Sequence, residues 1–134
     1  MIVLSENEYR IRSEGNLHVL VLRVKKQAEA AGSAEVIAAK ISTIASELGR
    51  NIVKYAYQGR INCKVVGEDK QKGFEIVATD EGPGIKDVDR AMNDRYSSGG
   101  TLGLGLPGTK RMADEFDIQS TVGKGTTVTA LVWI

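Results

Sequence analysis

Glu47-Leu-Gly-Arg-Asn-Ile-Val-Lys54 is the stretch that organises this sequence, because it continues a long apolar stripe and carries polar residues beside that stripe. The apolar residues recur at helical spacing and are Ile37, Ile41, Ile44, Leu48, Ile52 and Tyr55. On a helical projection of about 100° per residue, Glu47, Asn51 and Lys54 fall on one ridge next to the stripe. The pattern predicts a central helix whose polar ridge faces a groove.

The sequence on either side predicts helices and hairpins. An amphipathic helix with apolar positions Leu17, Val21, Val24, Ala28 and Ala31 follows a short strand at 9–12, and Ser33 is expected to cap the central helix, which Gly59 ends. Alternating patterns predict strands at 61–67, 74–80, 116–121 and 126–133, with helices near 87–94 and 107–115. We expect an α+β fold, an α/β sandwich whose mixed, mostly antiparallel sheet carries helices on one face.

Composition limits the possible functions. The 134 residues are expected to form a single domain, 1–134, and their 18 Lys+Arg and 17 Asp+Glu are interspersed, so neither nucleic acid nor a membrane surface is expected as a partner. No cleavable signal or membrane-spanning stretch is found. Cys63 lies in an alternating strand pattern and is expected to be a buried apolar residue, which fits the reducing cytoplasm. His18 is expected to be a surface or packing residue.

The ridge carries a carboxylate, an amide and an ammonium. Glu47 could serve as a proton acceptor, Asn51 as a metal ligand and Lys54 as a counter-charge for phosphate. The alternative is an ordinary solvated face with an i,i+4 hydrogen bond and an i,i+7 charge pair.

The turn Asp80-Glu-Gly-Pro-Gly84 follows an apolar strand that does not resume as a hairpin. Its glycines could let a flat base lie against the backbone, and the Asp80 carboxylate could accept a hydrogen bond from an exocyclic amine, although such sequences also form plain turns.

The second glycine-rich segment, 97–108, could direct backbone N–H groups at phosphate oxygens, and a helix starts where it ends. The alternative is a surface loop, against which the regular Leu102, Leu104 and Leu106 argue. The segment is not a dinucleotide fingerprint, because no strand precedes it and no acidic residue follows Asp117, and its Gly108-Thr-Lys110 order is not that of a P-loop.

In series, the ExxxN helix, the DxGxG turn, the GGxLGLGL loop and the GxGT turn at 123–126 resemble the four ATP-site motifs of the GHKL superfamily over most of the chain. Within it, the run from Ser98 to Phe116 is most similar to bacterial partner-switching serine/threonine kinases of the RsbT-type stressosome switch.

The resemblance implies a Bergerat-type fold with ATP between the central helix and a lid at about 86–102. It implies that Glu47 is the general base, that Asn51 ligates Mg²⁺, and that Asp80 receives the adenine amine with help from Thr126. The remaining nucleotide-binding positions that it implies are Arg50, Lys54, Gly82, Gly84, Ile85, Gly99, Gly100, Thr101, Leu102, Gly103, Leu104, Gly105 and Leu106.

The implied substrate is a Ser or Thr of a STAS-domain antagonist or stressosome scaffold protein, and the implied output is a PP2C-type phosphatase or another downstream enzyme. Two alternatives remain open. One is an anti-sigma factor of the same fold, which phosphorylates its antagonist and sequesters a sigma factor. The other is a regulator that binds nucleotide without transferring phosphate, against which the presence of Glu47 argues.

Overall fold

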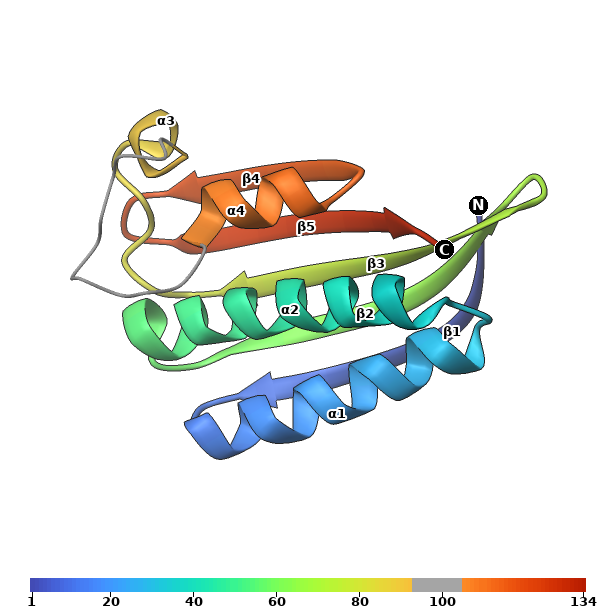
Figure 1. Cartoon of the computed structure of the whole chain (residues 1–134). Helices are drawn as coiled ribbons and strands as arrows, with labels where there is room; N and C mark the ends of the chain where they lie inside the picture. The colour runs from blue at the N-terminus through green and yellow to red at the C-terminus, as the bar shows by residue number, and fades with distance from the viewer. Residues whose placement is uncertain (93–104) are drawn as a thin grey trace.

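In a computed structural model, the described residues, 1–92 and 105–134, form one five-stranded sheet with helices on one side (Figure 1). The strands are β1 (Ile2–Ile11), β2 (Gly59–Glu68), β3 (Gln71–Asp80), β4 (Glu115–Thr121) and β5 (Gly125–Trp133). They are arranged in the order β1-β2-β3-β5-β4, and every pair in this described sheet is antiparallel. The expected α+β sandwich is confirmed, with a sheet that is antiparallel here rather than mixed.

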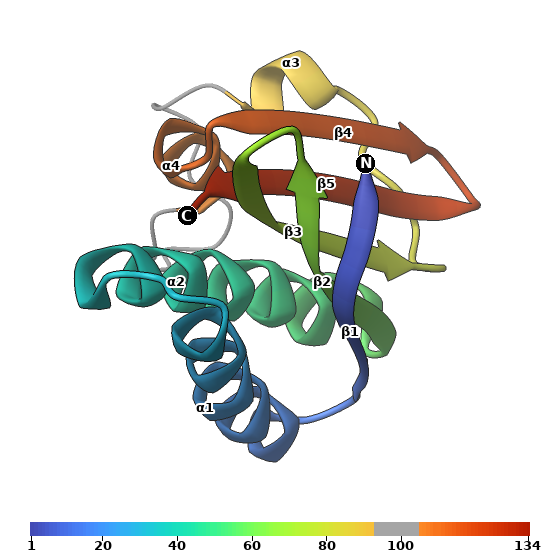
Figure 2. The same ribbon diagram turned by 90° about the vertical axis from the view of Figure 1, so that its right-hand side faces the viewer.

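The helices are α1 (Glu14–Ala30), α2 (Glu35–Asn51), the π-helix η1 (Ile52–Ala56), α3 (Val88–Ala91) and α4 (Gly105–Met112). Figure 2 shows α1, α2 and α4 on the same side of the sheet. Within the described ranges, no helix combines the length and the apolar character that a membrane span requires.

The core lies between the sheet and the pair α1 and α2. The stripe of α2 buries Ile41, Ile44 and Leu48, as the spacing predicts. In α1 the fully buried residues are Leu20, Val24 and Ala28, whereas Val21, which we placed in the stripe, is only partly buried. Gly49 allows the two helices to approach closely, because a Cβ at this position would lie 2.5 Å from Cδ2 of Leu17.

Two expectations about α2 are wrong. The residue that caps its N-terminus is Ala34, which offers no side-chain hydrogen bond, and the Ser33 hydroxyl instead donates to the Ala34 carbonyl at 2.8 Å. At the other end, the α-helix becomes a π-helix at Ile52, and Tyr55 is 41% exposed instead of packing in the core. The wider π turn rotates the residues after Ile52 away from the stripe that an α-helix would continue.

Cys63 is fully buried, as expected, and burial raises the pKa of its thiol to about 12. His18 is on the surface of α1. The strand expected at 9–12 is much longer and starts at Ile2. The β1 residues before Tyr9 are exposed, so they lack the apolar alternation that would have marked the strand.

Candidate functional site

A cavity of about 660 Å³ lies at one end of the sheet, where α2 and η1, the end of β3 and the start of α4 meet. It brings together residues that are far apart in the sequence. The predicted site residues that line it are Glu47, Arg50, Asn51, Lys54, Asp80, Gly84, Ile85, Gly105, Leu106 and Thr126. Gly82 is not part of the lining, and Gly99, Gly100, Thr101, Leu102, Gly103 and Leu104 lie outside the described residues.

Glu47 is held at the wall of this cavity by its neighbour on α2. Only 9% of Glu47 is exposed, and its Oε1 accepts a hydrogen bond from Nη1 of Arg50 at 2.9 Å. We expected Arg50 to assist nucleotide binding. The side chain of Arg50 is half exposed and pairs with Glu47, so its contact in the described structure orients a carboxylate.

Asn51 and Lys54 straddle the junction between α2 and η1. Asn51 is the last residue of the α-helix, and Lys54 follows in the π-helix, with its Nζ 5.1 Å from the centre of the Tyr55 ring. π-Helical turns are rare and are frequently found at functional sites. All three polar residues of the predicted ridge therefore reach one cavity, although the helix between them is not regular.

Asp80 ends β3 and begins the turn that borders the cavity. Its Oδ1 accepts a hydrogen bond from the backbone N–H of Gly82 at 2.9 Å, which fixes the direction of the other carboxylate oxygen. Thr126 lies opposite Asp80 in the β3–β5 register. The Thr126 hydroxyl is 2.8 Å from that of Ser120, which accepts a hydrogen bond from the backbone N–H of Ile85 at 2.7 Å. These bonds link the turn to the β4–β5 hairpin.

The glycines of this region also have a packing role that we did not expect. A Cβ at Gly82 would lie 2.7 Å from Cβ of Ala56, so Gly82 allows the turn to pack on η1. Gly84 has a φ of +77°, and a Cβ there would collide with the Thr121 carbonyl. Both positions thus need glycine because a side chain would block close packing within the protein. Gly84 also lines the cavity.

The helix expected at 107–115 spans Gly105–Met112, so it starts two residues earlier and ends three residues earlier than predicted, and the φ of Gly105 is +65°. The Thr109 hydroxyl donates to the Gly105 carbonyl at 2.9 Å and is fully buried. Because α4 begins at the wall of the cavity, its first-turn N–H groups lie at the end of the helix where an anion is stabilised.

Sequence reasoning missed part of the lining. Lys86, Arg90 and Arg111 also line the cavity, as do the apolar Ala78 and Val128. The sequence held one signal that could have found Arg111. It lies four residues after Pro107, which also lines the cavity, and therefore on the same face of α4. Cationic side chains outnumber carboxylates five to three in the lining, which suits a ligand with several negative charges.

A metal ion would find few ligands on the protein alone. Residues 1–92 and 105–134 hold no group of three or more His, Cys, Asp or Glu side chains that could coordinate one. Asn51 contributes a single neutral oxygen to the cavity. This donor set fits Mg²⁺ only if phosphate oxygens and water complete the coordination.

Comparisons with known proteins agree with this geometry. Residues 12–132 match the family model of the histidine kinase-like ATPase domain. The chain is 41% identical over 125 residues to the serine/threonine-protein kinase RsbT of Bacillus subtilis, covering 93% of this chain and 94% of that protein.

More distant relatives agree as well. The chain is 32% identical to an anti-sigma F factor of Caldanaerobacter subterraneus, covering 67% of this chain and 66% of that protein. The solved structure of the RsbU and RsbW domains of Rv1364c from Mycobacterium tuberculosis has a TM-score of 0.62 at 16% identity, covering 96% of this chain and 31% of that one. At this identity the structural likeness concerns the fold alone.

Proposed function

The chain belongs to the histidine kinase-like ATPase family, among its partner-switching serine/threonine-protein kinases, and from this premise we propose the residues and the substrate of the reaction. The transfer runs from the γ-phosphate of ATP to a Ser or Thr hydroxyl of a STAS-domain antagonist or stressosome scaffold protein. The observation that carries the proposal is the single cavity that Glu47, Asn51 and Asp80 all line.

The adenine ring belongs at the Asp80 end of the cavity. The carboxylate oxygen that the Gly82 bond leaves available would accept a hydrogen bond from the exocyclic amine. Thr126 lies opposite Asp80 and would assist, and the apolar Ala78 and Val128 would contact the faces of the base. Gly84 and Ile85 form the adjoining wall.

The phosphates belong at the other end, between η1 and the start of α4. Lys54 and the first turn of α4, from Gly105, would neutralise their charge, and residues 99–104 would complete the enclosure. Asn51 would hold Mg²⁺, which supplies charge stabilisation for the transferring phosphoryl group.

Glu47 is the proposed general base. The carboxylate takes the proton of the incoming hydroxyl as its oxygen bonds to the γ-phosphorus, and the bond from that phosphorus to the β,γ-bridging oxygen breaks, so that ADP leaves. Arg50 keeps Glu47 oriented through the 2.9 Å hydrogen bond. Once released from its STAS partner, the kinase would activate an output enzyme such as a PP2C-type phosphatase. The buried Cys63 thiol fits a cytoplasmic setting.

One experiment tests the base and the class of substrate together. Glu47→Gln keeps the shape of the side chain and an oxygen for Arg50 but cannot take a proton at neutral pH. With labelled ATP and the STAS proteins encoded nearby, we expect the variant to transfer phosphate about 10²–10⁴ times more slowly while ATP affinity changes less than tenfold. Glu35→Gln, at the exposed start of α2, is the matched control and should transfer at the wild-type rate.

A Glu47→Gln variant with full activity would mean that the base lies on the partner. Absence of transfer by the wild type to any STAS protein would leave only a nucleotide-binding regulator.

A second candidate function rests on the similarity to the anti-sigma F factor, which covers 67% of this chain. In this case the protein would also sequester a sigma factor. Size-exclusion chromatography with the sigma factors of the host organism, in the presence of ADP and of ATP, distinguishes the two functions. Co-elution with a sigma factor would favour the anti-sigma function, and co-elution with an output phosphatase would favour the switch kinase.

A further inference from the structure

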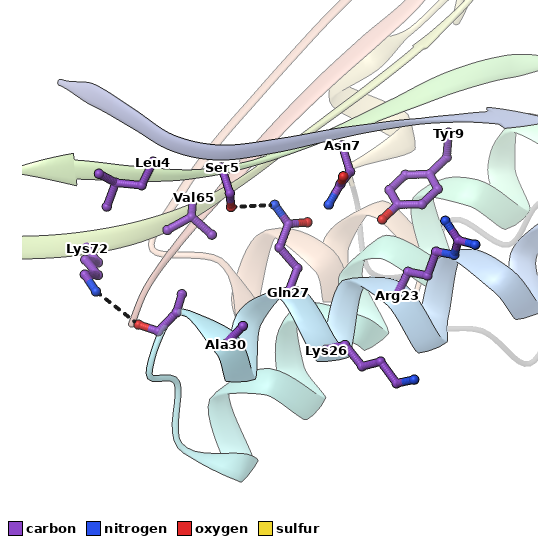
Figure 3. A pocket seen from close by; sticks show the side chains of 11 residues that line it. Leu4, Ser5, Asn7, Tyr9, Arg23, Lys26, Gln27, Ala30, Val65 and Lys72 are labelled. Carbon is purple, nitrogen blue, oxygen red and sulfur yellow. Dashed lines mark hydrogen bonds between the residues drawn. The ribbon is translucent and has the colours of Figure 1, made fainter.

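A second cavity, of about 640 Å³, lies between β1 and the C-terminal half of α1, and it shares no lining residue with the first (Figure 3). Its volume falls in the range of small-molecule sites. A strand face that looks toward a helix is usually apolar, yet β1 presents Ser5, Asn7 and Tyr9 there. This departure from the core pattern needs an explanation.

Two buried polar atoms at this cavity have no hydrogen-bond partner. They are the hydroxyl oxygen of Tyr9 and Oε1 of Gln27, and both residues line the cavity. Leaving such groups unpaired in a protein interior costs free energy, and native structures rarely do so. Figure 3 shows both side chains turned into the space between β1 and α1.

The orientation of Gln27 is fixed by its amide nitrogen. Nε2 donates to the Ser5 hydroxyl at 3.1 Å and to the Cys63 carbonyl at 3.2 Å. A flipped amide would place Oε1 against the Cys63 carbonyl, where neither atom can donate. Oε1 therefore presents an acceptor to the cavity, while Tyr9 presents a donor, because burial raises the pKa of its phenol further above neutrality.

The charges around the cavity have one sign. Its lining contains Arg23, Lys26 and Lys72 and no carboxylate. In the part of the chain that the structure describes, none of the three forms an ion pair, and Lys72 only donates to the Ala31 carbonyl at 3.4 Å. Arg23 lies beside Tyr9 in Figure 3, so a guanidinium and a hydroxyl donor can meet the same oxygens.

We propose that this groove, lined by Tyr9, Arg23, Gln27 and Lys72, binds a small phosphorylated metabolite that also carries hydroxyl groups, of the sugar phosphate or nucleoside monophosphate type. The phosphate oxygens accept hydrogen bonds from Arg23 and Tyr9, and a ligand hydroxyl donates to Oε1 of Gln27. An inorganic anion would accept the hydrogen bonds from Arg23 and Tyr9, but it would provide no donor for Oε1 of Gln27. The site is separate from the ATP cavity and does not depend on the function assigned to that cavity.

Ribose 5-phosphate is a suitable probe for the full chain saturated with ADP, which keeps the probe out of the first cavity. In ¹H–¹⁵N NMR titrations we expect saturable one-to-one binding that shifts the Gln27 side-chain amide, with a Kd below about 1 mM. Arg23→Gln should weaken binding at least tenfold. Arg10→Gln removes the same charge from the opposite face of β1 and should leave the Kd unchanged.

Tyr9→Phe separates binding from folding. Because the hydroxyl has no partner within the protein, its removal should leave the melting temperature unchanged or higher, while ribose 5-phosphate binds about tenfold more weakly. A variant that is destabilised yet binds normally would assign the hydroxyl to folding and overturn the proposal.

Two further outcomes would also overturn it. Inorganic phosphate binding as tightly as ribose 5-phosphate would indicate an adventitious ion only. A Glu-rich peptide that shifts the same amides at lower concentration than the sugar phosphate would make the groove a protein-docking surface.

Discussion

Asp80 accepts a hydrogen bond from the Gly82 N–H through one carboxylate oxygen and also lines the cavity, so its role in the turn and its proposed role in binding adenine can be tested separately. In Asp80→Asn, the amide oxygen can still accept the bond from the Gly82 N–H, and the amide nitrogen then faces the adenine amine, donor against donor. We expect ATP binding to weaken by about 1.5–3 kcal/mol, with little change in melting temperature.

Isothermal titration calorimetry with ATP and GTP checks this prediction. Wild-type protein should prefer ATP, and the variant should lose most of that preference. Equal affinities for the two nucleotides in the wild type, unaltered by the substitution, would contradict the adenine assignment.

Cys63 provides a residue-scale probe of the core. Burial raises the pKa of its thiol from 9.0 to about 12, so the thiolate is very scarce at pH 8. We expect iodoacetamide to label native protein about a thousandfold more slowly than protein in guanidinium chloride, as followed by mass spectrometry. Since the pKa is raised in the folded state, the stabilising contribution of the protonated thiol is complete below about pH 9 and is lost as the pH rises toward 12.

Rapid labelling of native protein at pH 8 would show that the β2 core opens readily. Comparing Cys63→Ala with wild type between pH 8 and pH 11 isolates the contribution of this thiol to the fall in stability.

At the scale of elements, the β4–β5 turn is fitted against the end of β3. Gly125 has a φ of +129°, and a Cβ there would collide with the carbonyl of Asp80. Gly125→Ala should therefore cost about 3 kcal/mol in the free energy of unfolding and weaken ATP binding, because Asp80 must shift.

Gly123 supplies the matched control for this prediction. It lies in the same turn with a φ of +83°, yet a Cβ there would meet nothing within 4 Å. Gly123→Ala should cost only the conformational penalty, about 1 kcal/mol, and leave ATP binding intact. Urea denaturation of the two variants measures the free energy of unfolding, and calorimetry measures their ATP affinity. Equal losses in both variants would refute the role of the Asp80 contact.

The elements that follow periodic apolar patterns were predictable from sequence. The β2–β3 and β4–β5 hairpins and the stripe of α2 are all in place, because alternation and helical spacing report burial directly. The π-helix at Ile52–Ala56 was not predictable from the sequence. Its hydrogen-bond pattern depends on tertiary contacts and not on the helix propensity of its residues. The first half of β1 was missed because its apolar residues, at positions 2–4, are consecutive and exposed and do not alternate with polar ones.

Some features of the candidate site could also be predicted from the sequence, and others could not. Positions that the motifs name, such as Glu47 and Asp80, could be found from sequence and do line one cavity. The salt bridge that turns Arg50 toward Glu47 and the packing that requires Gly82 depend on neighbours from the surrounding fold. Arg90 and Arg111 entered the lining for the same reason, because the approach of α3 and α4 to the cavity is set by the sheet.

On the scale of the whole molecule, the antiparallel order brings the end of β3 and the starts of β2 and β5 to one edge, where α2 also ends (Figure 1). The main cavity is therefore built from segments across most of the described chain, and a nucleotide bound there, as proposed, would contact several elements at once. Binding should consequently stabilise the fold as a unit rather than one helix or one turn.

Magnesium should contribute to this global stabilisation only together with nucleotide. The described residues offer no cluster of three acidic, histidine or cysteine ligands, and the single Asn51 oxygen is too little to hold the ion without phosphates and water. In thermal unfolding, Mg²⁺ alone should leave the melting temperature unchanged. ATP with Mg²⁺ at about 100 times its Kd should add about 2.7 kcal/mol, which raises the melting temperature by several degrees. Asn51→Ala should lose the part of the shift that EDTA removes and keep the part that ATP gives without metal. A rise produced by Mg²⁺ in the absence of nucleotide would mean that the ion has a protein site of its own, and Asn51 would then no longer be assigned as its ligand.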